Sequence, residues 1–438
     1  MHLKIAVVGS GISGLSAAWL LSRAHDVTLF ENEARPGGHS HTVEAPGRDG
    51  AVPVDMGFIV YNTPSYPNLV ALFDHLKVPT KSSNMGFAVS LNSGRIEYGG
   101  DSLVTLFSQT SNLARPRFWS MLRDLVRFYR QAPAEVATLD DETLTLGEYL
   151  DTRRYGSAFQ DDHLIPQASA IWSASTSDIR NYPVAAFIRF YQNHGLLKIT
   201  GRPEWRTVDG GSRAYVQRIL ADFKGRLVLG AKIDRVDSTP TGPVIHVDGS
   251  AQSFDAVVMA THANDGLGLL SAPSPRQSAL LGAFGYTLNE TVLHSDRSLM
   301  PKRRKVWSAW NYMGRTTASG ETALCVTYWM NRLQSLPPET PLYVTLNPIT
   351  PLEPSSVIRR EMFYHPRFDA AALHAQKSLW SIQGEGGIWW CGAYFGAGFH
   401  EDGLQSGLAA AEAIGGVRRP WNVDGESSRI LLKPACLA

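Results

Sequence analysis

Three glycines and a carboxylate near the N-terminus are the first residues whose types and spacing suggest chemistry. Gly9, Gly11 and Gly14 form the pattern Gly-x-Gly-x-x-Gly, and Glu31 follows 17 residues after the third glycine. In this pattern the first glycine makes a tight turn, the second lets the backbone approach a pyrophosphate, and the third lets a helix pack closely on a strand. Glu31 can accept hydrogen bonds from both ribose hydroxyls, which disfavours the 2′-phosphate of NADP. These residues predict a dinucleotide site.

The elements that position these residues must be a strand, a helix and a second strand. An apolar, β-branched run over 3–8 predicts a buried strand, and 26–30 predicts another. Between them the spacing of apolar residues predicts a helix, which Ile12 and Ser13 open and whose N-terminus faces the phosphates. The alternative is a glycine-rich turn without a ligand, and the order of strand, glycines, helix, strand and acid argues against it.

A second glycine pair beyond the acid distinguishes FAD from NAD. The cofactor-binding candidates in this stretch are Asn32, Gly37, Gly38, His39, Gly57 and Phe58. Their arrangement resembles the extended fingerprint of the flavin-dependent amine oxidase superfamily, in which the second glycine turn passes close to the diphosphate and the flavin. Members of that superfamily usually carry Arg after the glycine pair, where this chain has His39. The resemblance implies that the cofactor is FAD.

Later segments resemble further pieces of the same cofactor domain. Residues 208–211 open a helix, 227–236 is strand-like, and 254–261 resembles the strand that returns to the dinucleotide. A buried strand over 388–392 precedes a helix that, in this superfamily, points its N-terminus at the flavin pyrimidine. The resemblance places six more residues at the cofactor: Ile233, Thr261, Gly392, Asp402, Gly403 and Leu404.

The expected fold class is α/β. A Rossmann-type FAD-binding domain of the glutathione reductase type would be interleaved with an α+β substrate domain, as in amine oxidases. The first substrate segment has a mostly helical pattern, and the second is rich in strands. The FAD-binding domain is expected over 1–85, 205–270 and 381–420, the substrate domain over 86–204 and 271–380, and a C-terminal tail over 421–438.

Several blocks narrow the resemblance to the N-terminal flavin domain of plant cyclopropane fatty acid synthases and their stand-alone bacterial relatives. They include 60–62, 201–205, 307–311, 326–331 and 399–403. No methyltransferase domain follows residue 420, so we expect a reaction other than cyclopropanation. The resemblance implies desaturation of a methyl-branched or otherwise modified unsaturated fatty acyl chain, in which flavin N5 takes a hydride and a base takes a neighbouring proton.

Three residues are candidates for catalysis. Glu290 occupies the position at which the corresponding amine oxidase segment carries a lysine near flavin N5, so a carboxylate there would serve as a base. His400 and Glu401 precede the helix expected at the flavin, in a glycine-rich loop that permits close backbone approach. The alternatives are a surface Glu290 on a strand edge and a His400 with structural contacts only.

Aromatic residues could line a long apolar tunnel for the acyl chain, although aromatic side chains more often pack in cores. The candidates are Tyr61, Trp172, Trp310, Tyr328, Trp329 and Tyr394. Two other functions fit a flavin site. One is a true amine oxidase, which Glu290 disfavours, and the other is a flavin-binding accessory subunit that hands lipid to a separate methyltransferase partner.

Composition and charge narrow the class of protein. The chain has 438 residues with 41 Lys and Arg against 40 Asp and Glu, and this balance argues against nucleic-acid binding. Three cysteines are too few for a disulfide framework or a zinc site, so we expect no metal and a cytoplasmic location. The arginine-rich stretch 113–131 and the basic run 302–305 fit a peripheral contact with the inner face of a membrane, with a solvated helix packed on the core as the alternative.

Overall fold

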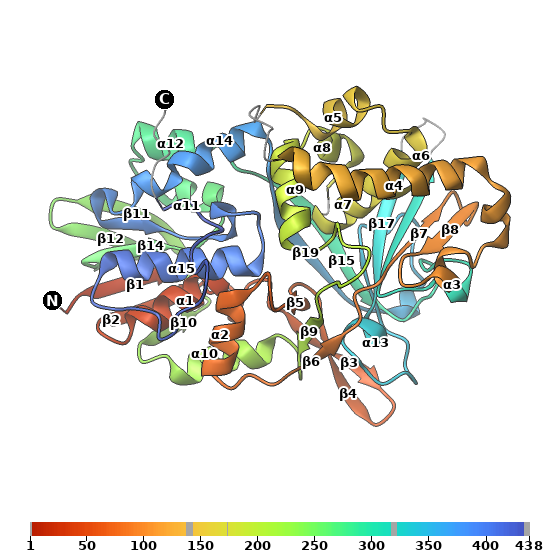
Figure 1. Ribbon diagram of the computed structural model, residues 1–438. Helices are drawn as coiled ribbons and strands as arrows, with labels where there is room; N and C mark the ends of the chain where they lie inside the picture. The colour runs from red at the N-terminus through yellow and green to blue at the C-terminus, as the bar shows by residue number, and fades with distance from the viewer. Residues whose placement is uncertain (1, 137–142, 173, 317–321, 433–438) are drawn as a thin grey trace.

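A parallel sheet lies at the centre of the body that holds the N-terminus (Figure 1). The computed structural model describes residues 2–136, 143–172, 174–316 and 322–432. The sheet has five strands in the order β10-β2-β1-β14-β20. They are β1 (Lys4–Val8), β2 (Asp26–Glu31), β10 (Arg226–Leu229), β14 (Ala256–Met259) and β20 (Ile388–Trp390). The apolar runs of β1 and β14 follow from burial on both faces, which parallel sheets require.

Alternate residues of β1 face two different layers. Ile5 and Val7 pack on the side of α1 (Ile12–Leu21), α10 (Arg213–Asp222) and α15 (His400–Ile414). Ala6 and Val8 face the other side, where a three-stranded antiparallel sheet packs. That sheet contains β11 (Ile233–Thr239), β12 (Gly242–Val247) and β13 (Ser250–Ser253).

A seven-stranded sheet forms the second body, in the order β19-β15-β18-β17-β16-β7-β8. Helices lie along its upper side in Figure 1. The strands are β7 (Phe87–Leu91), β8 (Ile96–Gly99), β15 (Gly285–His294), β16 (Trp310–Thr316), β17 (Thr322–Trp329), β18 (Tyr343–Leu346) and β19 (Val357–Arg367). The helices are α4 (Pro116–Glu135), α5 (Leu146–Thr152), α6 (Ser157–Phe159), α7 (Ile165–Trp172), α8 (Thr176–Arg180) and α9 (Val184–Asn193).

Short elements join the two bodies. The small strands are the hairpin β3 (Thr42–Gly47) and β4 (Gly50–Asp55), and the sheet of β5 (Val60–Asn62), β9 (Trp205–Val208) and β6 (Thr80–Ser83). The remaining helices are α2 (Pro67–His75), α3 (Leu103–Leu106), α11 (Ala263–Leu269), α12 (Pro275–Leu281), α13 (Met330–Leu333) and α14 (Ala370–Leu379). Among the described residues, no helix combines the length and the apolar character needed to cross a bilayer.

The structure confirms the α/β class and corrects two expectations about local structure. The strand expected over 227–236 is two strands, because Gly230 adopts a left-handed φ of 68° and turns the chain from β10 into β11. The segment 113–131 is not a free amphipathic helix, because Phe118, Met121 and Tyr129 of α4 are buried in the core. The tail expected from 421 packs on α2 and α15 as far as the structure describes it, and 433–438 lies outside the described residues.

Candidate active site

The turn between β1 and α1 has the geometry of a phosphate cradle. Gly9 has a φ of 100°, and a Cβ at Gly14 would lie 1.8 Å from the Gly9 carbonyl oxygen. A Cβ at Gly11 would meet nothing within 4 Å, so the space beside this residue is open. Gly11 is the N-cap of α1, and no side chain caps the helix. The first amides of α1, which belong to Ile12 and Ser13, can therefore bind an anion.

Glu31 ends β2 with its buried carboxylate turned toward this loop. The carboxylate accepts hydrogen bonds from the Ser10 backbone N–H at 2.9 Å and from the Glu33 N–H at 2.9 Å. The Ser10 hydroxyl also donates to it, at 2.5 Å. These donors fix the carboxylate next to the phosphate loop, as the ribose of a dinucleotide requires. Asn32, in contrast, is exposed.

The second glycine turn lies directly on the first. The Gly37 N–H donates to the Ser10 carbonyl at 3.0 Å, and a Cβ at Gly38 would lie 3.1 Å from the Gly11 Cα. Gly57 packs so closely on the backbone of His39 that a Cβ there would lie 2.1 Å from its carbonyl oxygen. Only glycine leaves room for the chain to follow the diphosphate in this way.

Two glycines of α15 bring its N-terminal half against that of α1. A Cβ at Gly403 would lie 2.8 Å from Ser13 Oγ, and one at Gly407 would lie 2.2 Å from the Ser13 carbonyl oxygen. Leu404 is fully buried between them. The partial positive charge of each helix N-terminus is therefore placed beside the same cradle.

The remaining cofactor candidates follow the carboxyl ends of the strands of the parallel sheet. Ile233 follows the turn after β10, Thr261 follows β14, and Gly392 follows β20. Ligands of open α/β sheets bind at this edge. The open space at Gly11, the uncapped amides and the fixed Glu31 carboxylate together fit the diphosphate and ribose of FAD.

Four histidines lie where this edge meets the seven-stranded sheet, and we call them the histidine cluster: His39, His262, His365 and His400. The His39 ring centre lies 5.5 Å from that of His365 and 5.0 Å from that of Phe363. Burial and repulsion from the other three histidines hold the pKa of His39 well below its usual range. Burial lowers the pKa of His365 to about 4 and that of His400 to about 3. His39, His365 and His400 are therefore neutral at pH 7.

Two asparagines fix the tautomer of His365. Asn289 Nδ2 donates to the Thr287 carbonyl at 3.1 Å and lies 2.9 Å from His365 Nδ1. Asn347 Nδ2 donates to Asn289 Oδ1 at 2.7 Å, which leaves Asn289 Nδ2 as the donor to the ring. His365 Nδ1 is then an acceptor, so its neutral ring carries the proton on Nε2.

His400 is held on the FAD-binding side of the cluster. Its Nε2 lies 2.9 Å from the Tyr215 hydroxyl and 3.1 Å from Ser40 Oγ. Its ring stacks on Phe58 at a centroid distance of 3.7 Å. These contacts position the ring and favour a structural role for it.

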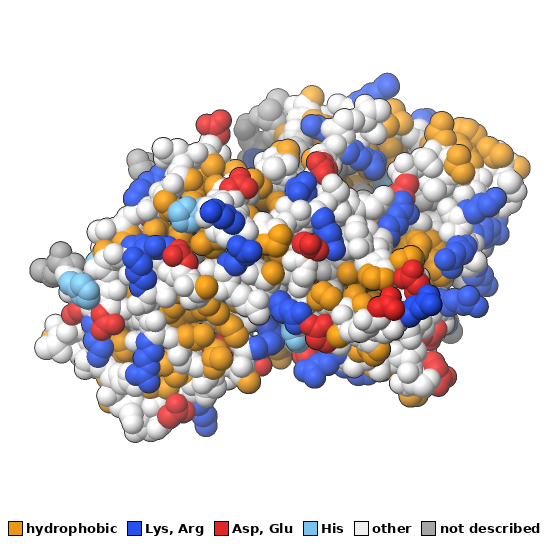
Figure 2. Space-filling view, turned by 90° about the horizontal axis from the view of Figure 1, so that it is seen from below, with side chains coloured by type: hydrophobic (Ala, Val, Ile, Leu, Met, Phe, Trp, Pro, Cys, Tyr) orange, Lys and Arg blue, Asp and Glu red, His pale blue; other side chains and the backbone are white. Residues whose placement is uncertain are grey.

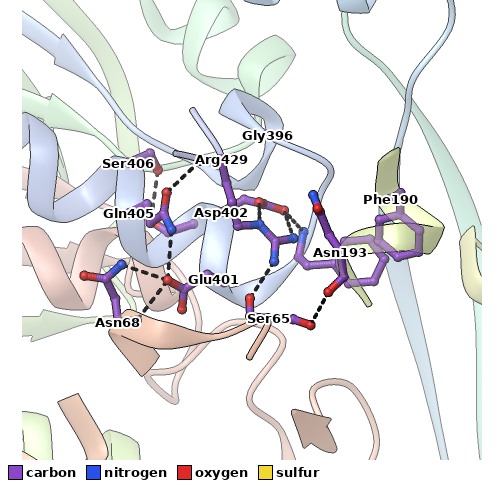
Figure 3. Close-up of polar contacts among 12 residues, drawn as sticks. Ser65, Asn68, Phe190, Asn193, Gly396, Glu401, Asp402, Gln405, Ser406 and Arg429 are labelled. Carbon is purple, nitrogen blue, oxygen red and sulfur yellow. Dashed lines mark hydrogen bonds and ion pairs between the residues drawn. The ribbon is translucent and has the colours of Figure 1, made fainter. Parts of the chain in front are cut away.

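Glu401 points toward the first turn of α2 (Figure 3). Its carboxylate accepts from the Asn68 N–H at 3.0 Å, the Leu69 N–H at 3.0 Å, Asn68 Nδ2 at 2.8 Å and Gln405 Nε2 at 2.9 Å. Burial raises its pKa, although these four donors oppose that change. A carboxylate with four donors is suited to capping α2, which favours a structural role over the expected catalytic one.

Glu290 lies on the face of β15 that turns away from the cluster. Successive side chains of a strand point to opposite faces, and Asn289 is the residue that reaches His365. Glu290 pairs instead with Arg360 of β19, and its side chain is 37% exposed. The base expected at this position is therefore directed into a shallow cleft lined by 348–352 and Arg360.

The six aromatic candidates do not line one tunnel, which corrects that expectation. Tyr61 packs among the helices of the FAD-binding body, and Trp329 packs with Trp307. Trp310 and Tyr328 pair across β16 and β17. Trp172 and Tyr394 belong to the largest cluster, and each has a buried polar atom without a partner in the described structure. The sequence alone does not indicate in which hydrophobic cluster each of these six aromatic side chains packs.

Asp402 is buried in the first turn of α15, and its partner comes from the C-terminal segment. Arg429 Nε lies 2.6 Å from Asp402 Oδ1, and Arg429 Nη1 donates to the Ser65 carbonyl at 2.7 Å (Figure 3). Ser65 Oγ in turn donates to the Asn193 carbonyl at the end of α9. Arg429 thus connects α15 with the helical part of the other body.

Comparison with known sequences now identifies the family. The sequence model of flavin-containing amine oxidoreductases matches residues 12–415. The chain belongs to this family. Members of this family are flavin-containing oxidoreductases, which agrees with the cradle described above and with FAD as the cofactor that it fits. The narrower relation to cyclopropane fatty acid synthases stays a prediction.

Individual relatives are distant from this chain. A protein named as a flavin-containing monoamine oxidase, AofH of Mycobacterium tuberculosis, is 27% identical over 265 residues. The match covers 59% of this chain and 56% of AofH, so it spans about half of that relative's length. Putrescine oxidase with bound putrescine aligns over 94% of this chain and 99% of its own, with a TM-score of 0.67 and 15% identity. The CLA-producing fatty acid isomerase from P. acnes aligns over 94% and 98%, with a TM-score of 0.68 and 14% identity. At sequence identities this low, the structural similarity shows a shared fold and nothing more specific.

Sequence reasoning missed several residues of this family member's site. His262 and His365 follow no recognisable motif, and Asn289 was adjacent to the residue chosen from the resemblance. Arg429 lies in a polar segment beyond the family match, where no pattern separates it from other arginines. Strand alternation offers the one available signal, because Asn289 and Glu290 cannot both face the cofactor.

Proposed function

We propose that this flavoenzyme desaturates a neutral, apolar substrate, namely a fatty acyl chain. The observation that carries the proposal is that every carboxylate of β15, β19 and α15, the elements that bring His365 and His400 to the cluster, already has a partner among the described residues. The pairs are Glu290 with Arg360, Glu361 with Arg359, Asp402 with Arg429, Glu412 with Arg419, and Glu401 with the first turn of α2. An ammonium group entering this site would lose its hydration without gaining a counter-charge.

The cluster itself supports a neutral substrate. The rings of His365 and His400 are uncharged at pH 7, because burial lowers their pKa values to about 4 and about 3. Phe363 lies beside His39, and Phe399 stacks on Phe190 at a ring distance of 4.8 Å. Hydrocarbon is stabilised by such surroundings, whereas a charged amine is not.

Desaturation removes two hydrogens from neighbouring carbons, one as a hydride and one as a proton, and leaves a carbon–carbon double bond. FAD, when bound, supplies the hydride acceptor. We assign the proton to His39, which follows the glycine turn that lies on the phosphate loop and whose neutral ring has a lone pair. The Nε2–H of His365 is a hydrogen-bond donor that can orient a polar group of the substrate. This assignment replaces Glu290, His400 and Glu401, whose side chains have the other partners described above.

A second candidate function is the oxidation of an amine. The 27% identity to AofH, which carries a monoamine oxidase name, favours it, as does the fold shared with putrescine oxidase. The fold shared with the fatty acid isomerase of P. acnes supports acyl chemistry to the same degree. The two candidate functions differ in what they require of the site, because an amine substrate needs a counter-charge there and an acyl chain does not.

The decisive experiment is anaerobic. FAD-loaded protein is mixed with phospholipids that carry plain unsaturated, methyl-branched or cyclopropane acyl chains, and separately with a panel of amines, while the flavin absorbance is followed. We expect bleaching by one class of lipid, together with a new double bond detected by mass spectrometry. Bleaching by amines alone would overturn the proposal. Bleaching by neither, with stable binding of a lipid methyltransferase, would support the accessory-subunit function instead.

A further inference from the structure

Large apolar side chains are exposed beside β8, at the edge of the seven-stranded sheet. They come from α3, from the short turn Thr110–Ala114 and from the first turns of α4. Their exposed fractions are 74% for Leu103, 75% for Val104, 52% for Leu113 and 49% for Trp119. Trp119 Nε1 donates to the Leu113 carbonyl at 2.9 Å, and its ring centre lies 5.7 Å from that of Phe107. We call this single surface the α3 patch.

Basic residues surround the α3 patch. Lys302, Arg304 and Lys305 are exposed, and none of them forms an ion pair within the described part of the chain. Their loop packs on α3, since a Cβ at Gly99 would meet both Thr105 Cβ at 3.1 Å and the Val306 carbonyl oxygen at 3.2 Å. Arg115 adds another positive charge, and among the described residues its guanidinium donates only to the Arg95 carbonyl and to Asn112 Oδ1.

One buried residue, Glu97 of β8, holds both parts of this surface in place. Its carboxylate accepts from the Lys302 N–H at 2.7 Å and from Arg303 Nη1 at 2.7 Å. Its backbone N–H donates to Gln109 Oε1 at 2.6 Å, and its carbonyl accepts from Asn112 Nδ2 at 3.0 Å. The basic loop and the turn after α3 are therefore fixed to the same residue, so they present the apolar and the basic side chains together.

The end of the molecule that holds α3 in Figure 1 remains on the right in Figure 2. There the surface shows a group of hydrophobic side chains next to several Lys and Arg side chains. We propose that the α3 patch docks on a membrane that contains anionic lipid. Leu103 and Val104 project from a short helix, as residues that enter the acyl region do, and the surrounding cations complement lipid phosphates.

This proposal differs from the contact first expected. The apolar face of α4 is buried, and Arg117 of that helix pairs with Asp162 at 2.7 Å, so α4 contributes its first turns and not its length. The basic run 302–305 belongs to the proposed membrane contact, as it did in the contact expected from the sequence. The inference is independent of the proposed function, because docking is measured without turnover.

The test is vesicle co-flotation of the full-length, FAD-loaded protein. Vesicles of phosphatidylcholine alone are compared with vesicles containing phosphatidylglycerol, at low and high salt. One variant combines Leu103→Glu and Val104→Glu, and another combines Lys302→Glu, Arg304→Glu and Lys305→Glu. Matched controls on the FAD-binding body are Leu229→Glu for the apolar change and Lys224→Glu, Arg226→Glu and Lys232→Glu for the charges, all at exposed positions.

We expect salt-sensitive binding to the anionic vesicles and little binding to phosphatidylcholine. Reversal of the three basic residues should weaken binding roughly 100-fold or more, and the control variants should bind as the parent does. The FAD content of each variant verifies that it is folded. Absence of binding to anionic vesicles, or equal binding by patch and control variants, would overturn the proposal. Loss of self-association in the patch variants, without any vesicle binding, would identify a protein interface instead.

Discussion

Arg429 and Asp402 form a buried ion pair at the first turn of α15, with Nε and Oδ1 separated by 2.6 Å. The guanidinium side chain is 12% exposed and the carboxylate is fully buried. Arg429 also donates its backbone N–H to Gln405 Oε1, so this residue contacts α15 through both its side chain and its backbone. α15 is thus held from outside the part of the chain that the family model matches.

Replacement of Arg429 by Gln should destabilise the protein and weaken FAD binding. Removing one partner of a buried ion pair leaves the other charge without compensation, which costs about 3–5 kcal/mol. Thermal unfolding and fluorescence titration with FAD measure the two effects. Addition of Asp402→Asn should restore part of the loss, because it removes the unpaired charge.

Arg418→Gln is the matched control for this prediction. Arg418 lies in the same segment and pairs with Glu412 and Glu426, but its side chain is 48% exposed. Exposed pairs contribute less than about 1 kcal/mol, so this variant should unfold and bind FAD like the parent. Equal losses in the two variants would show that the pair with Asp402 has no special role.

Two glycine variants should separate cofactor binding from folding. Gly11→Ala adds a methyl group where nothing lies within 4 Å, so the apoprotein should keep its stability and lose FAD. Gly14→Ala places a Cβ 1.8 Å from the Gly9 carbonyl oxygen, so the protein should fail to fold or should unfold at a much lower temperature. Unfolding curves of the apoproteins, with and without added FAD, check both outcomes. If Gly11→Ala retains full FAD affinity, the diphosphate does not lie on this loop.

Substitution of His39 should slow substrate-dependent flavin reduction without removing the flavin. A general base contributes about 10²–10⁴-fold, and His39→Asn removes the lone pair assigned to this task. Glu290→Gln should change the rate by less than about twofold, because Glu290 faces the other side of β15. Stopped-flow absorbance gives the rates. The reverse result, a slow Glu290→Gln and a normal His39→Asn, would restore the carboxylate as the base.

The protein should lose stability as the pH falls from about 7 to about 4. Burial lowers the pKa values of His163, His294 and His365 to about 4 and that of His194 to about 3, against 6.5 in an unfolded chain. Between those pH values the unfolded state binds more protons, so the free energy of unfolding rises with pH. Asp55 acts in the opposite sense, because burial raises its pKa to about 6.

His163→Asn isolates one contribution to this dependence. One histidine that is protonated only when unfolded changes the free energy of unfolding by about 1.4 kcal/mol per pH unit. Between pH 5 and 6, the free energy of unfolding of the variant should therefore rise less steeply with pH, by that amount. Its stability at pH 7 will also fall, because the Tyr98 hydroxyl loses a hydrogen-bond partner at 3.0 Å. Urea unfolding at several pH values gives the slope, and an unchanged slope would show that His163 is charged in the native state.

The cofactor half of the molecule could be predicted from sequence because its residues are consecutive and are constrained by the backbone. Gly9, Gly14 and Gly57 are needed at contacts that a Cβ would close, and such steric requirements appear directly as residue types. The strand, helix and strand order around them follows from periodicity. The break at Gly230 shows the limit of periodicity, because an apolar run does not reveal where one strand turns into another.

The other half of the site could not be predicted because its residues meet through tertiary packing. His39 and His365 lie far apart in the chain, and their approach depends on how β15 and β19 meet the glycine turn. The same is true of Arg429 and Asp402. Sequence position favours Glu290 as the base, but successive side chains of a strand point to opposite faces, and an offset of one residue places this carboxylate on the face away from the histidine cluster.

The order in which the parallel sheet is assembled has a consequence for synthesis of the protein. The phosphate loop leaves the ribosome well before β20, which pairs with β14, and α15, which packs on α1, because both of these elements follow residue 387. A nascent chain lacking these elements exposes the apolar edge of β14 and the face of α1 that α15 covers, and such surfaces attract chaperones and proteases. Firm retention of FAD therefore requires that translation has passed α15.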